Sequence, residues 1–216
     1  RDFLGDWRGT LVCDDYAGYK ALFGHGITEA GCLAHARRKF FDLHTQNQSL
    51  IAAEALDYFG QLYQIERDVA GLTPEERQHS RQTRAKPIAD QLHAWLMQQR
   101  QKVPNGSASA KAIDYSLKRW AALTRYLSDG QIPIDNNWIE NQIRPIALGR
   151  KNWLFAGSKR AGQRAAAIMS LIQSAKLNGH DPHVYLKDVL TRLPTHRASR
   201  IGELLPHRWR AEAALT

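Results

Sequence analysis

RGTLVCDDYAGYKALFGHGITEAGCLA, residues 8–34, is the stretch that decides the fold of this chain. Its apolar start, residues 8–13, predicts a short buried strand that ends at a pair of carboxylates beginning with Asp14. A helical turn is expected over residues 16–23 and a second short strand over residues 27–34. The connection from Asp15 to Gly26 is twelve residues, about the minimum for a parallel crossover. The stretch therefore predicts a small βαβ unit with Asp14 at the carboxyl end of its first strand. Active sites of open α/β sheets lie at that end of the strands.

The rest of the chain is patterned as helices. Apolar residues recur at helical spacing from residue 36 to residue 129, where Thr73 is placed to cap a helix and Pro87 to break or kink one. We therefore expect an α/β chain that is predominantly helical. It divides into four segments: the strand-bearing residues 1–36, a helical insertion over 37–130, a segment with a helix that carries Glu140 over 131–180, and a carboxyl-terminal helical extension over 181–216.

Length and composition exclude several classes of protein. The 216 residues contain no run of about 20 apolar residues, which a membrane span needs, and no secretory signal opens the chain. Two cysteines are too few for a disulfide framework, which favours a reducing cytosolic setting. The chain begins at Arg1 and its methionines are Met97 and Met169, so we expect a fragment of a longer protein.

Positive charge is concentrated in one part of the sequence. Lys and Arg number 30 against 21 Asp and Glu, a net charge of +9. Residues 141–180 hold seven of the basic residues and no acidic one, which leaves +2 (9 − 7) for the remainder. A solvated helix face is the ordinary explanation of such a run. Its length, and the glycines and aromatic residues within it, favour contacts to a nucleic-acid backbone.

Two carboxylates are candidates for divalent-metal chemistry. Asp14 follows the first strand and Glu140 lies on a helix, and converging carboxylates are what hard cations bind. The structural alternatives are a solvated strand end for Asp14 and an i, i+4 pair with Arg144 for Glu140. Cys32 and His35 invite a zinc assignment, but a structural zinc needs four ligands and no second pair has suitable spacing.

Five stretches of the chain closely resemble transposases of the bacterial insertion-sequence-sixty-six family. The resemblance covers nearly the whole chain and is weakest in its helical middle. The stretches are CDDYAGY (13–19), GCLAHARRKFFDLH (31–44), DNNWIENQIRPIALGRKNWLFAGS (135–158), NGHDPHVYLKDVLTRL (178–193) and IGELLPHRW (201–209).

The resemblance implies a DDE transposase with an RNase H-like core, of which two parallel strands are retained here. In such enzymes three carboxylates bind two Mg²⁺ ions, cut the 3′ ends of the element and use the freed hydroxyl to attack target DNA. The family motif L-x-x-D-x-Y-x-G-Y places the second acid on Asp14, and DNN-x-x-E-x-x-I-R-P places the third on Glu140. Asp15 stands where a small residue is usual. The first acid has no counterpart upstream, so we expect weak metal binding and no strand transfer from this chain by itself.

Partners and further site residues are also implied. Double-stranded DNA, as terminal repeats and target, is the expected partner, with a homo-oligomer and accessory proteins of the same element as further partners. The location is the cytoplasm, on the bacterial nucleoid. Candidates for DNA binding are Arg144, Arg150, Lys151, Trp153, Lys159, Arg160 and Arg164, and candidates for the active-site rim are Asp135, Asn136, Asn137, His35 and Arg38.

Two other functions share part of this evidence. A non-catalytic DNA-binding remnant of a truncated transposase would keep the basic segment without chemistry. A metal-dependent nuclease of RNase H type would share the carboxylates but would not explain the block over residues 135–158.

Overall fold

Two compact units make up the chain, one of residues up to Trp138 and one from Ile139 onward. The computed structural model describes residues 4–23, 26–153 and 155–211, apart from the side chains of residues 151 and 153. The chain is predominantly helical and contains a sheet of two parallel strands, which confirms the predicted α/β class. Within these ranges no helix combines the length and apolar character that a membrane span requires.

The sheet of the first unit pairs β1 (Gly9–Cys13) with β2 (Ile27–Gly31). The strands are parallel, with Gly9 opposite Ile27 and Cys13 opposite Gly31, and a 3-10 helix, η1 (Ala17–Leu22), lies in the connection. The expected βαβ unit is therefore confirmed. The predicted end of the second strand at residue 34 is wrong, because the Leu33 N–H donates to the carbonyl of Ile134 and α1 begins at Leu33.

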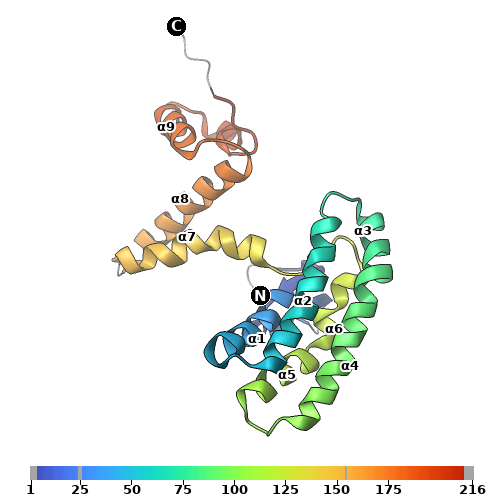
Figure 1. Ribbon diagram of the computed structural model, residues 1–216. Coiled ribbons are helices and arrows are strands. Elements are labelled where there is room, and N and C mark those ends of the chain that lie inside the picture. The colour runs from blue at the N-terminus through green and yellow to red at the C-terminus, as the bar shows by residue number, and fades with distance from the viewer. Residues whose placement is uncertain (1–3, 24–25, 154, 212–216) are drawn as a thin grey trace. The chain divides into compact units, whose positions relative to one another are not determined.

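Helices make up most of the first unit and supply most of its core (Figure 1). Phe40, Phe59, Leu92, Leu96 and Ile113, from four different helices, are each at most 1% exposed. Burial of such side chains is the main stabilising contribution in a unit with so little sheet. The helices are α1 (Leu33–Asn47), α2 (Leu50–Asp68), α3 (Pro74–Ser80), a π-helix η2 (Arg81–Ala85), α4 (Lys86–Lys102), α5 (Ala108–Lys118), α6 (Trp120–Leu123) and a 3-10 helix η3 (Arg125–Ser128).

The helical run from α3 to α4 changes geometry without ending. Thr73 caps α3 in a capping box with Glu76, as its sequence predicts. The expected interruption at Pro87 takes the form of the π-helical turn η2 just before it, and Pro87 lies in the first turn of α4. Proline has no backbone N–H to donate to the preceding turn of an α-helix. Because Pro87 lies in the first turn of α4, where that hydrogen bond is not required, the helix loses none.

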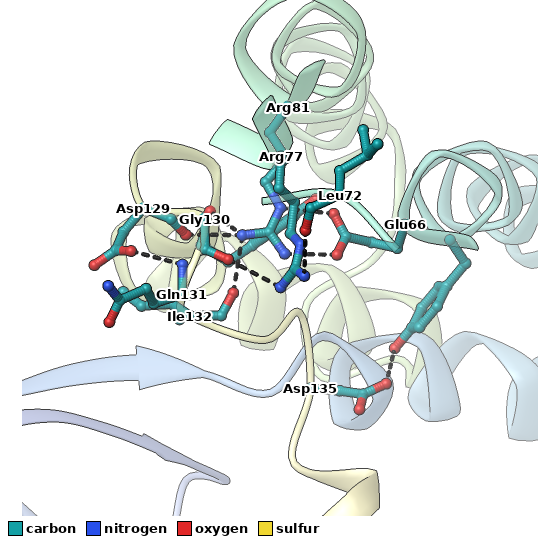
Figure 2. A network of polar contacts seen from close by, with 11 residues as sticks. Glu66, Leu72, Arg77, Arg81, Asp129, Gly130, Gln131, Ile132 and Asp135 are labelled. Carbon is teal, nitrogen blue, oxygen red and sulfur yellow. Dashed lines mark hydrogen bonds and ion pairs between the residues drawn. The ribbon is translucent and has the colours of Figure 1, made fainter. Parts of the chain in front are cut away.

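Arg81, on η2, is the most deeply buried charged side chain among the described residues, at 1% exposed. Its Nε and Nη2 donate to the two carboxylate oxygens of Glu66 on α2, at 2.8 and 2.6 Å. Its Nη1 donates to the carbonyls of Tyr126, Asp129 and Ile132, at 2.9, 2.7 and 2.9 Å (Figure 2). Because the guanidinium meets an acceptor on both sides, it joins α2 and η2 to the segment that leads toward residue 135.

The same segment is also held at Gly130. The Arg77 Nη1 donates to the Gly130 carbonyl at 3.0 Å (Figure 2). A Cβ atom at position 130 would lie 1.8 Å from the carbonyl oxygen of Pro74, so the backbones approach too closely for any side chain. Gly130 therefore lies two residues past η3 at a position where only glycine fits.

The second unit contains α7 (Asn137–Trp153), whose first residues belong to the first unit, followed by α8 (Lys159–Leu177), α9 (Pro182–Arg192) and a 3-10 helix η4 (Ala198–Leu204). The Ser158 side chain caps α8 by accepting the backbone N–H of Ala161. A small core joins α8, α9 and the tail, and the Tyr185 hydroxyl donates to the Leu204 carbonyl at 2.9 Å. This core consists of Ala175, Tyr185, Val189, Leu204 and Trp209.

The buried ion pair gives a first prediction. An Arg81→Met chain keeps most of the side-chain volume but leaves Glu66 and three carbonyls without their donors. We expect its free energy of unfolding, measured by urea denaturation, to fall by about 3–5 kcal/mol. Arg84→Met is the matched control, because Arg84 lies on the same π-helix and pairs with Asp68 at the exposed surface. Equal losses in the two variants would contradict a central role for Arg81.

Candidate functional site

A hollow of about 330 Å³ lies at the carboxyl end of β1 in the first unit. Asp14, His35 and Arg38, three of the residues predicted from the sequence, line it together. The parallel pairing of β1 and β2 brings this about, since Asp14 follows β1 and α1, which carries the other two residues, follows β2. The remaining lining residues are Asp15, Tyr16, Lys39, Asp42 and Tyr115.

The two neighbouring aspartates have different surroundings. Asp15 is engaged by the guanidinium of Arg119 and by the Lys20 ammonium, at 2.7 Å from Lys20 Nζ. The hydrogen bond from Lys20 and the charge of Arg119 lower the pKa of Asp15. Arg119 is 8% exposed and also bonds to Glu29 at 2.8 Å. Asp15 therefore balances a nearly buried arginine.

Asp14 keeps its carboxylate available to the hollow. Its Oδ1 accepts the backbone N–H of Tyr16 at 3.1 Å, and in the described ranges it forms no ion pair. A carboxylate of this kind has the hard oxygen donors that magnesium binds. The structure thus separates Asp14 from Asp15 by the presence of Arg119 and Lys20, which the local sequence does not reveal.

The described residues do not form a complete set of metal ligands. No group of three His, Cys, Asp or Glu side chains in the described part of the chain could hold a metal ion. Asp14 belongs to the first unit, and Glu140, in the first turn of α7, belongs to the second. The carboxylate chemistry of both residues fits Mg²⁺, but each unit supplies one of these two carboxylates.

The DNN motif begins at Asp135, which is tied to α2. The Tyr63 hydroxyl donates to Asp135 Oδ2 at 2.8 Å, and burial together with the Asp135 charge raises the pKa of Tyr63. Oδ1 accepts the backbone N–H of Asn137 at 3.0 Å, and Oδ2 also accepts from the Asn137 side chain at 2.9 Å. Asp135 therefore holds the start of α7, and its carboxylate is occupied by three donors.

Asn136 is tied to the end of the sheet. Its backbone N–H points to the Cys32 Sγ at 3.5 Å, and Cys32 in turn donates its own N–H to the Cys13 carbonyl at 3.1 Å. Both cysteines are free and buried, and burial raises the pKa of Cys13 to about 11 and also raises that of Cys32. Such thiols stay protonated at neutral pH and pack as small apolar groups.

The candidate DNA-binding residues of the second unit lie on α7 and α8. The side chains that the structure describes here are exposed, and in those ranges none forms an ion pair. Lys159 and Arg160 occupy the first turn of α8, where the helix dipole is positive and cations are unfavourable unless an anion is near. The side chains of Lys151 and Trp153 lie outside the described residues. The candidates whose side chains the structure describes are Arg144, Arg150, Lys159, Arg160 and Arg164.

Several residues near the site carry no local signal in the sequence. Arg119 is 104 residues from Asp15, and Tyr63 is 72 residues from Asp135. Each stands in an ordinary amphipathic helix or at its end, where a polar residue predicts only a solvated face. Comparison of this chain with many related sequences is the signal that could have paired them.

The chain is similar to known proteins over nearly its whole length. A family model described as "Transposase IS66 family" matches residues 1–164, and a second, "IS66 C-terminal element", matches residues 170–207. The uncharacterized protein y4hP of Sinorhizobium fredii is 40% identical over 230 residues, covering 99% of this chain and 42% of that protein. The uncharacterized protein y4jD of the same organism is 39% identical over 218 residues, covering 97% and 43%. The chain spans about two fifths of the length of these curated relatives. No solved structure matches it.

The hydrogen bond between Tyr63 and Asp135 gives a second prediction. A Tyr63→Phe chain loses a hydroxyl donor to a half-buried carboxylate, so its free energy of unfolding should fall by about 1.5–3 kcal/mol. Tyr58→Phe is the control, because Tyr58 lies on the same helix and its hydroxyl has no hydrogen bond in the described ranges. Faster amide hydrogen exchange at Asn137 in the Tyr63 variant alone should accompany the loss. Identical stability of the two variants would show that the bond does not hold the start of α7.

Proposed function

Because the chain belongs to the IS66 family of transposases, we propose that it carries part of the catalytic centre and of the DNA-binding surface of a DDE transposase with an RNase H-like core. The observation that supports the catalytic part is the position of Asp14. It follows a parallel strand, lines a hollow and forms no ion pair in the described ranges, while its neighbour Asp15 is neutralised. That is the environment a metal-binding carboxylate needs.

Asp14 and Glu140 would hold magnesium together with a further carboxylate. Two Mg²⁺ ions supply activation of an attacking hydroxyl and stabilisation of the leaving oxygen in phosphoryl transfer. The protein's own contribution is placement: β1 ends at Asp14, and the Asp135 bonds hold the start of the helix that carries Glu140. His35 and Arg38 line the Asp14 hollow, where they can contact a phosphate beside the metal.

DNA would be held by the cations of α7 and α8. The exposed arginines and lysines there lack carboxylate partners in the described ranges, and the amino-terminal turn of α8 adds backbone N–H groups. An acid-free run of this length offers little repulsion to a phosphate backbone. The proposed DNA contacts are Arg144, Arg150, Lys151, Lys159, Arg160 and Arg164, with Trp153 at a distorted DNA end.

Catalysis is tested by a third prediction. In a longer protein that contains this chain, assayed with Mg²⁺ on the terminal repeats of its element, Asp14→Asn and Glu140→Gln should each abolish cleavage and leave DNA affinity intact. Glu54→Gln is the matched control, since Glu54 is an exposed acid on α2.

Unaltered cleavage by the Glu140→Gln protein would overturn the catalytic assignment. If the unsubstituted protein binds DNA but does not cleave it under any divalent metal, the chain acts instead as a non-catalytic DNA-binding remnant.

DNA binding is tested by a fourth prediction. The affinity of the 216-residue chain for a fluorescently labelled duplex, measured by anisotropy, should fall steeply with salt because each neutralised phosphate releases counterions. The triple variant Arg150→Ala, Arg160→Ala, Arg164→Ala should lower the slope of log affinity against log salt by about 2–3. A flat salt dependence of the unsubstituted chain, or an unchanged slope in the triple variant, would contradict the proposed DNA surface.

A further inference from the structure

Three hollows in the first unit join into one groove between α1 and α5. The hollow at Asp14 shares Asp15, Lys39 and Tyr115 with a second one of about 300 Å³. That second hollow shares Lys39 and Lys111 with a third of about 240 Å³. Lys39 therefore lies at the junction of all three, and we name the continuous depression the α1–α5 groove.

Two of the four acids that line the groove are neutralised by arginines. Asp15 is engaged by Arg119, and Asp114 accepts the Arg100 Nε at 2.7 Å. These pairs remove from the groove two negative charges that would repel an anionic ligand.

In contrast to these acids, four cations on the groove wall have no ion-pair partners in the described ranges. Arg38, Lys39, Lys111 and Lys118 are exposed, and in the described ranges none of them forms an ion pair. The Lys39 Nζ instead lies 4.5 Å from the centre of the Tyr115 ring, a weak cation–π contact that a stronger anionic partner can replace. The groove therefore has four available positive charges against the carboxylates of Asp14 and Asp42.

The spacing of these cations fits a repeating anion. Lys111 and Lys118 are seven residues apart on α5, or two turns and about 10 Å along the helix. One strand of DNA advances about 3.4 Å per nucleotide, so this interval corresponds to about three nucleotides. Ala108 and Ala112, which line the far end of the groove, leave room for a backbone to lie against the helix.

We propose that the α1–α5 groove binds the sugar-phosphate backbone of the DNA strand that leads away from Asp14, with Lys39, Lys111 and Lys118 as the phosphate contacts. The site lies in the helical insertion and is distinct from the cations of α7 and α8. It rests on the proposed function, because Asp14 as the reacting end gives the strand its starting point. The helical insertion then guides the substrate strand in addition to supporting the fold.

The test is DNA affinity of the 216-residue chain carrying Lys39→Ala, Lys111→Ala and Lys118→Ala together. We expect weaker binding to the labelled duplex and a salt slope lower by about 2–3. The charge-matched control is Arg84→Ala, Lys86→Ala, Lys102→Ala, which removes three exposed cations of the same unit outside the groove and should keep the slope of the unsubstituted chain. A groove variant that binds as the control does would overturn the proposal.

A second measurement does not depend on how the substitutions affect folding. A photoreactive benzoylphenylalanine placed at Lys111 should cross-link to the duplex, and one placed at Lys102 should not. Absence of a cross-link at position 111 while DNA is bound would also overturn the groove assignment.

The outcomes separate this inference from the proposed function. Loss of affinity in the α7–α8 triple variant with none in the groove variant rejects the groove alone. If the unsubstituted chain binds no DNA, the proposed DNA surface fails as well.

Discussion

The guanidinium of Arg81 is the interaction on which the rest of the first unit depends. A buried cation is costly unless every donor has an acceptor, and Arg81 meets that condition by binding Glu66 on one side and three backbone carbonyls on the other. Those carbonyls belong to the chain between Tyr126 and Ile132. The desolvation penalty therefore enforces the path of a segment that has no regular secondary structure of its own over residues 129–136.

The segment over residues 129–136 joins the helical insertion to the helix that carries Glu140. It is fixed first by Arg81, then by the Leu33 N–H at the Ile134 carbonyl, and finally by the Tyr63 hydroxyl at Asp135. The helix bearing Glu140 starts two residues later. The sequence of the helical insertion predicts only core packing. In the structure its side chains also fix the position at which the DNN motif begins. Its outer surface, with the cations of α1 and α5, extends from the hollow at Asp14.

Much of the fold could be predicted because its signals are local. The helical spacing of apolar residues, the short connection between the strands and the cap at Thr73 predict elements that the structure confirms. The errors lie at boundaries such as residue 34, where a hydrogen bond to distant Ile134 decides the conformation. At the candidate site, the sequence and its family resemblance selected Asp14, and the structure supplies the physical distinction from Asp15. The pairing of Arg119 with Asp15 and the contact of Lys39 with Tyr115 could not be predicted, because folding alone brings these residues together.

The sequence by itself determined the helical class, the parallel strand pair, the transposase family and the concentration of positive charge after Glu140. These properties follow from spacing and residue type, which act over a few neighbouring positions. Only the tertiary structure decided which charges are neutralised and which are available. Arg81 and Arg119 are buried against carboxylates, while Lys111 and Lys118 are exposed and have no carboxylate partner among the described residues. The physical reason is that the electrostatic interactions of a charged side chain depend on its desolvation and on its partners. Both are set by residues far away in the sequence.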